Sequence, residues 1–112
     1  MEMFAGDYTE IEVSLVDTNG NPVSLLGVSA TYQISETIDT TALVTKTTND
    51  DIEIISDVNG NTKLKIKLFQ ADTENLNGIY YQEFEVRDTN DNPYTVLAGN
   101  TLAIKPTALK GW

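Results

Sequence analysis

Apolar and polar residues alternate along most of this chain, and that alternation is typical of strands that bury one face. Between residues 8 and 16, the apolar positions Ile11, Val13 and Leu15 alternate with the polar residues Glu10, Glu12 and Ser14. A comparable strand pattern recurs over residues 28–35, 42–47, 51–56, 62–68, 79–87 and 94–104. About seven short strands divided by turn residues favour a single all-β antiparallel sandwich.

Two segments depart from the simple strand pattern. Gly99 falls where the inward positions of residues 94–104 change parity, which predicts a β-bulge. Residues 70–76 carry the one helical pattern, and we expect Asp72 or Thr73 to cap a single turn before Gly78. The predicted fold therefore contains at most one short helical turn.

Lysines and glutamates occupy the outward positions of several predicted strands. Lys63, Lys65 and Lys67 lie on the face opposite the apolar residues of segment 62–68. Outward glutamates on other strands are Glu10, Glu12, Glu53, Glu83 and Glu85. Opposite charges on neighbouring strands stabilise a sheet, and lysines on a strand discourage edge-to-edge aggregation. We expect a solvated, ion-paired face rather than a phosphate site.

Three predicted turns share an Asp-x-Asn-x-Asn pattern, at residues 17–21, 57–61 and 88–92. Alternating carboxylate and amide oxygens can converge on a calcium ion, but an EF-hand loop also needs Gly at its sixth position and Glu at its twelfth. None of the three runs has either residue. Because Asn and Gly tolerate a positive φ, we expect hairpin turns and no metal site, with a fortuitous cation site at a loop end as the alternative.

Composition excludes several kinds of chemistry. The chain has 112 residues, 17 acidic against 7 basic side chains, a formal net charge of −10, and neither His nor Cys. The lack of Cys excludes disulfides, thiolate zinc sites and thiol nucleophiles, and the lack of His removes the commonest general base near neutral pH. The acidic balance disfavours nucleic-acid binding, which requires clustered Lys and Arg. The length fits one domain.

Catalysis in this chain would have to rest on carboxylates. Glu10 and Glu12, like Glu83 and Glu85, alternate along one strand and therefore point to a solvated face, where nothing raises a carboxylate pKa. The sequence contains neither a Gly-rich phosphate loop nor a nucleophile elbow. We predict no enzymatic activity and no cofactor.

The N-terminus has neither a basic start nor an apolar run, and no stretch approaches the length of a membrane span. We therefore predict no signal peptide and no membrane partner.

Four segments carry a resemblance to a known family. They are Gly6-Asp7-Tyr8, DTNGNPVSLLGV at residues 17–28, LNGIYY at residues 76–81, and residues 88–99. Together they resemble the small Ig-like domain of tailed-bacteriophage virion proteins, best known as the N-terminal domain of the baseplate upper protein and similar to domains of tail and head fibres. The resemblance extends over residues 4–106 and implies an Ig-like β-sandwich.

The resemblance also implies a function in binding rather than catalysis. A bacteriophage virion structural protein of this kind docks on other virion proteins, in a baseplate or tail attachment. The alternative is a capsid decoration or a head-fibre anchor, and a further alternative is a carbohydrate- or host-surface-binding module. The implied partners are baseplate, tail or capsid subunits within the virion, and the oligomeric state stays open.

One tyrosine has an expected structural role. The run Leu76-x-Gly78-x-Tyr80 resembles the tyrosine corner of Ig-like sandwiches, in which the hydroxyl bonds back to the backbone just upstream. Tyr80 is therefore expected to stabilise the fold.

The candidate interface residues lie near the two ends of the chain. They are Met3, Phe4, Leu109 and Trp112, large apolar residues that lie outside the predicted strands. Met and aromatic residues are enriched at the cores of protein interfaces. We expect an N-terminal arm over residues 1–7, the sandwich over residues 8–106 and a C-terminal tail over residues 107–112. In the alternative interpretation, Phe4 caps one end of the sandwich and Trp112 belongs to a frayed tail.

Overall fold

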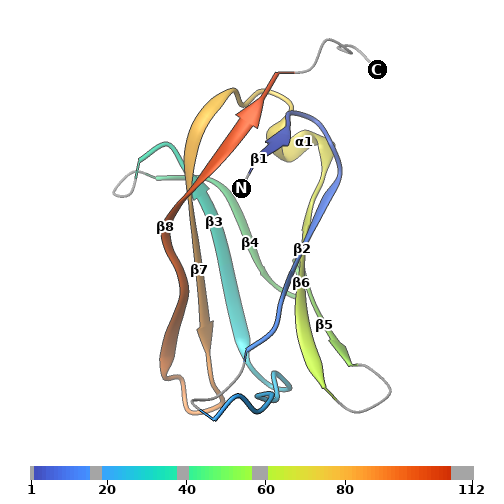
Figure 1. The fold of residues 1–112 in the computed structure, drawn as a ribbon, viewed down its shortest axis with the longest axis vertical. Coiled ribbons are helices and arrows are strands. Elements are labelled where there is room, and N and C mark those ends of the chain that lie inside the picture. Colours follow the sequence, from blue (N-terminus) through green and yellow to red (C-terminus); the bar gives the residue numbers. More distant parts are fainter. Residues whose placement is uncertain (1, 16–18, 38–40, 57–60, 107–112) are drawn as a thin grey trace.

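A computed structural model describes residues 2–15, 19–37, 41–56 and 61–106, with the backbone alone for residues 95–99 (Figure 1). This part of the chain forms eight strands and one short helix. The elements are β1 (Glu2–Phe4), β2 (Thr9–Val13), β3 (Ser29–Ser35), β4 (Ala42–Thr48), β5 (Asp51–Ser56), β6 (Thr62–Leu68), α1 (Gln70–Thr73), β7 (Gly78–Arg87) and β8 (Pro93–Lys105). The all-β class predicted from the alternating pattern is confirmed.

The strands form the two layers of a sandwich. Pairing links them in the order β1-β8-β7-β3-β4-β5-β6-β2. β4 and β5 pair only at Thr47 with Asp51 and Thr48 with Ile52, so this contact is a short link between two larger units. We call β1, β8, β7, β3 and β4 the larger sheet, and β5, β6 and β2 the smaller sheet. Figure 1 shows β8, β7 and β3 on one side and β2, β6 and β5 on the other.

This division matches an immunoglobulin-like sandwich. There, the B, E and D strands form one sheet and the C, F and G strands the other. β2, β6 and β5 correspond to the first group, and β3, β7 and β8 to the second. Most neighbours are antiparallel, whereas β1 runs parallel to β8 and β5 parallel to β4.

The long β7–β8 ladder contains the bulge predicted at Gly99. Gln82 lies opposite Asn100 and Glu83 lies opposite Ala98, so Gly99 is the extra residue. A second irregularity follows, where the partners of Phe84 and Glu85 are Leu97 and Thr95. Two bulges in one ladder raise its local twist and curve β8 around the core.

The core lies between the two sheets. Tyr32 of β3 and Phe84 of β7 are fully buried, with ring centroids 6.4 Å apart and an edge-to-face orientation. The smaller sheet contributes Leu64, Ile66 and Leu68, all with no exposed surface. These are the inward positions of the period-2 pattern, so the pattern predicted the correct buried face of β6.

The short helix is placed as predicted, but it is capped differently. The residue at its N-cap is Phe69, and the Asp72 carboxylate accepts a 2.7 Å hydrogen bond from the Phe69 backbone N–H. Thr73 is fully buried and accepts a hydrogen bond from a distant backbone group. Asp72 therefore caps the helix through its side chain, as expected, but from the third helical position, and the N-cap residue itself is Phe69.

The predicted N-terminal arm also needs correction. Residues 2–4 form β1, which pairs in register with Ala103, Ile104 and Lys105 of β8. A strand of three residues is too short to show a period of two, and its position is fixed by its partner strand rather than by its own sequence. The predicted tail over residues 107–112 lies outside the described residues.

In the described ranges, no helix has the length and apolarity needed to cross a bilayer.

Candidate functional site

A surface depression lies beside β1, the end strand of the larger sheet. In the described chain, the edge of β1 away from β8 has no partner strand. The depression has a volume of about 290 Å³ and is lined by Glu2, Met3, Phe4, Asp7, Thr9 and Lys105. Phe4 is 51% exposed and presents an apolar ring beside polar groups. We call this surface the Phe4 depression.

The outer face of the larger sheet extends the apolar surface near Phe4. Glu2 is the partner of Ala103, and Ala103 is the partner of Ile79, so the three residues form one row across β1, β8 and β7. Ile79 is 60% exposed. The ion pair from Lys105 Nζ to Glu2 Oε2, at 3.1 Å, borders this row.

The structure separates the predicted interface residues. Met3 is only 8% exposed and belongs to the core, so it offers little surface to a partner. Successive side chains of a strand point to opposite faces, which is why Phe4 is exposed while its neighbour is buried. Leu109 and Trp112 lie outside the described residues.

Tyr80 makes the backbone contact that defines a tyrosine corner. Its hydroxyl accepts a 3.0 Å hydrogen bond from the Asn77 N–H and donates to the Asn77 carbonyl oxygen at 3.3 Å. The ring is 8% exposed and packs at the start of β7. Whether this contact stabilises the fold stays a prediction.

Two chain crossings lead from the larger to the smaller sheet. The first, from β1 to β2, turns at Gly6, whose φ is 82°. The Gly6 N–H donates a 3.0 Å hydrogen bond to the buried Thr73 Oγ1, and the Ala5 N–H donates to the Lys105 carbonyl oxygen at 2.8 Å. Neutral hydrogen bonds therefore hold this crossing against α1 and β8.

The second crossing, from β4 to β5, turns at Asn49 and Asp51, both with a positive φ. The ammonium group of Lys46 lies 2.7 Å from Asp51 Oδ2 and 2.8 Å from Asp72 Oδ2, and its side chain is 6% exposed. Burial lowers the pKa of Lys46, but the hydrogen bonds to these two carboxylates outweigh that effect and raise the pKa above its ordinary value. The Phe69 ring lies 5.3 Å from the ammonium nitrogen.

A second depression lies at this crossing. Its volume is about 410 Å³, and its lining includes Thr48, Asn49, Asp51, Glu53, Lys67 and Phe69. Tyr8 packs beside it, with its ring centroid 5.4 Å from that of Phe69. We call this surface the Phe69 depression.

The outer face of the smaller sheet carries the predicted ion pairs. Lys63 pairs with Glu12 at 2.8 Å, Lys65 with Glu10 at 3.5 Å, and Lys67 with Glu53 at 3.7 Å. All six side chains are partly exposed, so each pair contributes little to stability. The face is thereby close to neutral in a strongly acidic protein.

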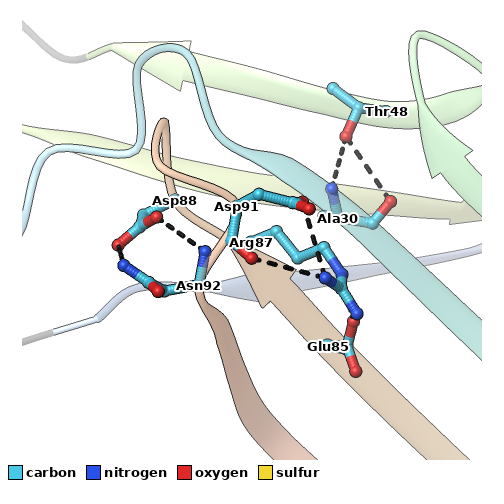
Figure 2. A network of polar contacts seen from close by, with 7 residues as sticks. All are labelled: Ala30, Thr48, Glu85, Arg87, Asp88, Asp91 and Asn92. Carbon is cyan, nitrogen blue, oxygen red and sulfur yellow. Dashed lines mark hydrogen bonds and ion pairs between the residues drawn. The ribbon is translucent and has the colours of Figure 1, made fainter.

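The Asp-rich turn at residues 88–92 joins β7 to β8, as predicted. The Asp88 carboxylate accepts hydrogen bonds from the N–H groups of Asn90 and Asn92, both at 2.9 Å. Hydrogen bonds from Asn92 lower the pKa of Asp88 most strongly. Figure 2 shows Asp88 turned onto Asn92, with Arg87 reaching Glu85 and Asp91. The Asp88 carboxylate therefore caps the backbone of the turn in which it lies.

This end of the sandwich is also tightly packed. Gly27 has a φ of 78°, and a Cβ there would lie 3.1 Å from Thr89 Cγ2. The side chain of Thr48 bonds both backbone groups of Ala30, where β4 leaves β3 (Figure 2). Within the described ranges, no cluster of three or more acidic side chains is placed to hold a metal ion.

Comparison with known proteins finds neither a protein-family model nor a curated protein that matches this chain.

Sequence reasoning missed both Phe69 and Lys46. Phe69 follows β6 and continues its outward row, and Lys46 interrupts an otherwise uncharged edge strand. A lysine at an inward position of a strand was the available signal, because a buried ammonium group requires partners. Its partners come from a crossing and from a helix, which no strand pattern brings together.

Proposed function

We propose that this protein is a non-catalytic structural module of a bacteriophage virion that docks on other virion proteins, in a baseplate or tail attachment. The fold is compatible with the Ig-like domain implied by the sequence resemblance. The observation that carries the proposal is the half-exposed Phe4 on the rim of the depression beside the unpaired edge of β1.

The composition of this edge supports docking by a partner strand or loop. Unpaired backbone groups of an edge strand can bond an added strand, and side-chain pockets then give specificity. Phe4 and Ile79 supply the apolar contacts, while Glu2 and Lys105 form a polar rim. An apolar centre with a charged rim is typical of protein interfaces.

The electrostatics of the described carboxylates also favour binding over catalysis. A general acid needs a carboxyl with a raised pKa in a dry cleft. The pKa of Glu12 is lowered by its hydrogen bond to Lys63, and that of Asp88 is lowered by the Asn92 backbone. Glu10, Glu53 and Asp51 are each paired with a lysine.

The proposal is tested by locating the protein in purified particles of the phage that encodes it. Heads and tails are separated, and the protein is quantified in each fraction by mass spectrometry. Enrichment in tails supports the proposed attachment, and enrichment in heads indicates the capsid or head-fibre alternative. Absence from both fractions contradicts a virion role.

A pair of variants tests the Phe4 depression itself. Phe4→Ser and Leu43→Ser remove side chains with the same exposure, 51%, from edge strands at opposite sides of the larger sheet. We expect Phe4→Ser to lower incorporation into particles and Leu43→Ser to leave it unchanged. Equal incorporation of both variants at equal folded stability would contradict the assignment of this surface. Deleting residues 109–112 tests Leu109 and Trp112 in the same assay.

A further inference from the structure

The Phe69 depression brings together residues that are far apart in the chain. Tyr8 precedes β2, Asn49 lies in the crossing from β4, and Lys67 and Phe69 lie at the end of β6. Tyr8 and Phe69 are 54% and 42% exposed, respectively, although they contact each other. Two large aromatic rings thus remain open to solvent beside a concave surface of about 410 Å³.

Polar groups of complementary kinds surround these rings. Asn49 carries both a donor and an acceptor, Lys67 donates, and Glu53 accepts. All three line the depression. Its volume lies within the range of small-molecule sites. A ligand there would find hydrogen-bonding groups on one side and an aromatic surface on the other.

Three carboxylates around the depression each have a lysine partner, although Lys46 is shared between Asp51 and Asp72. Asp51 is bound to Lys46 at 2.7 Å, Glu53 faces Lys67 at 3.7 Å, and Glu10 faces Lys65 at 3.5 Å. An ionic ligand would therefore have to displace an existing partner. A neutral ligand rich in hydroxyl groups can donate to Glu53 and accept from Lys67 while these two side chains, 3.7 Å apart, continue to compensate each other's charge.

Saccharides have this chemistry. One face of a pyranose ring presents C–H groups, which are attracted to the negative face of an aromatic ring, and its hydroxyls donate and accept hydrogen bonds. We propose that the Phe69 depression binds a neutral saccharide, with Phe69 and Tyr8 as the aromatic platform and Asn49, Glu53 and Lys67 as hydrogen-bonding groups. This site is separate from the Phe4 depression, and it does not depend on the docking function proposed above.

The backbone at Asn49 allows a variant that keeps the turn. Its φ is 68°, a left-handed conformation that Asn adopts more readily than most residues other than glycine. Glycine adopts the same conformation readily, so Asn49→Gly removes the amide while preserving the turn.

The test uses the isotope-labelled full chain and two probes. A glycan array identifies bound saccharides, and two-dimensional NMR then locates them on the protein by titration with an array hit or with glucose, galactose, rhamnose and N-acetylglucosamine. We expect amide shifts at residues 48–53, at residues 67–69 and at Tyr8. No array binding together with no shift, or shifts confined to other residues, would overturn the proposal.

Variants make the result specific. We expect Asn49→Gly to weaken binding about tenfold, since it removes hydrogen bonds to the ligand but no core contact. Phe69→Ala should weaken it at least as much. Tyr94→Ala removes an aromatic ring elsewhere that is 55% exposed, against 42% for Phe69, and should have no effect. Unchanged affinity in Asn49→Gly and Phe69→Ala would assign the ligand to another surface.

A cationic probe distinguishes saccharide binding from cation binding at the Phe69 depression. Acetyl-arginine amide is added at the same concentrations as the sugars. Shifts at the Phe69 depression with this probe alone would show that aromatic rings and carboxylates select a cation, and the saccharide assignment would be wrong. Shifts with the neutral sugars alone support it.

Discussion

Two crossings lead from the larger to the smaller sheet, and different interactions hold them in place. Each requires a residue with positive φ, Gly6 in the first and Asn49 and Asp51 in the second. Each is tied to α1, the first through Thr73 and the second through Asp72. The first is held by a neutral hydrogen bond, whereas the second is held by a buried ammonium group between two carboxylates.

The two crossings also differ in the strand edges that lie beside them. The β1 crossing leaves an open edge, where Phe4 stays exposed beside a depression. The β4 crossing lies on an edge strand whose outward residues carry no charge, and Lys46 points inward from it. An inward charge on an edge strand discourages pairing with another chain. The comparison therefore contrasts an open edge at β1, which is the docking surface proposed above, with an edge at β4 that carries an inward charge.

The largest expected effect is at the charged crossing. Lys46→Ala leaves Asp51 and Asp72 without their cation and opens space beneath Phe69. Because both carboxylates keep some contact with solvent, we expect a loss of about 1–3 kcal/mol in the free energy of unfolding, less than for a fully buried pair. Chemical denaturation measures it.

Lys63→Ala is the matched control, because its side chain is 40% exposed in a surface ion pair. It should change the midpoint of unfolding little. Equal losses in the two variants would show that burial of the Lys46 ion pairs has no special role.

The crossing from β1 to β2 should lose nearly as much stability when one hydrogen-bond acceptor is removed. Thr73→Val keeps the shape of the side chain but leaves the buried Gly6 N–H unpaired. We expect a loss of about 1–2 kcal/mol by chemical denaturation. Thr45→Val on the exposed face of β4 provides the control. A Thr73→Val protein as stable as the parent would mean that α1 does not hold this crossing.

The tyrosine corner follows α1 in the chain, and a variant there is expected to have a smaller effect on stability. Tyr80→Phe removes the hydroxyl that bonds both backbone groups of Asn77. We expect a loss of about 0.5–1.5 kcal/mol, because Asn77 retains partial access to water. Tyr81→Phe alters the next residue on the outward face and should be silent. Denaturant melts with equal midpoints for Tyr80→Phe and the parent would contradict the structural role of Tyr80.

The smallest effect expected is a difference in alkaline stability. The raised pKa of Lys46 means that the folded state holds its proton more tightly than the unfolded state, so its stabilisation is complete below its ordinary pKa of 10.5 and is lost as the pH rises through the higher folded value. Burial also raises the pKa of Tyr32, which adds a loss of the same sign above its ordinary value of 10.0.

The measurement is unfolding free energy against pH in the parent, Lys46→Met and Thr73→Val. Lys46→Met should show a shallower alkaline decline, and Thr73→Val should decline as the parent does. The same slope in all three proteins would assign the whole decline to Tyr32 and other groups, and would remove charge as the distinction between the crossings.

The strands could be predicted because their signal is local. β5 and β6 begin and end at the predicted residues, and β3, β4 and β7 differ by one residue at an end. The Lys63, Lys65 and Lys67 ion pairs also follow from strand parity, which places their glutamate partners on the same outer face. The hairpin at residues 88–92 follows from the backbone preferences of Asp and Asn.

The two surface depressions could not be predicted in the same way. The sequence marked Phe4 as a candidate and Tyr8 as an outward tyrosine, but it did not relate Tyr8 to Phe69 or either ring to Asn49. Met3 was assigned to a surface because a three-residue strand leaves no periodic trace. In the sheet, Met3 is paired with Ile104 of β8, a buried residue near the other end of the described chain.

The sequence by itself determined which faces of the strands are buried and where most turns fall. It also determined which kinds of chemistry are excluded because the chain lacks the side chains that they require. These properties depend on neighbouring residues and on composition. Only the tertiary structure decided that Lys46 lies between Asp51 and Asp72, that Thr73 receives the Gly6 N–H, and that Phe69 opens beside Asn49. Those contacts form where separate elements meet, because a buried charge or N–H takes whatever partner the packing of the sheets brings within reach.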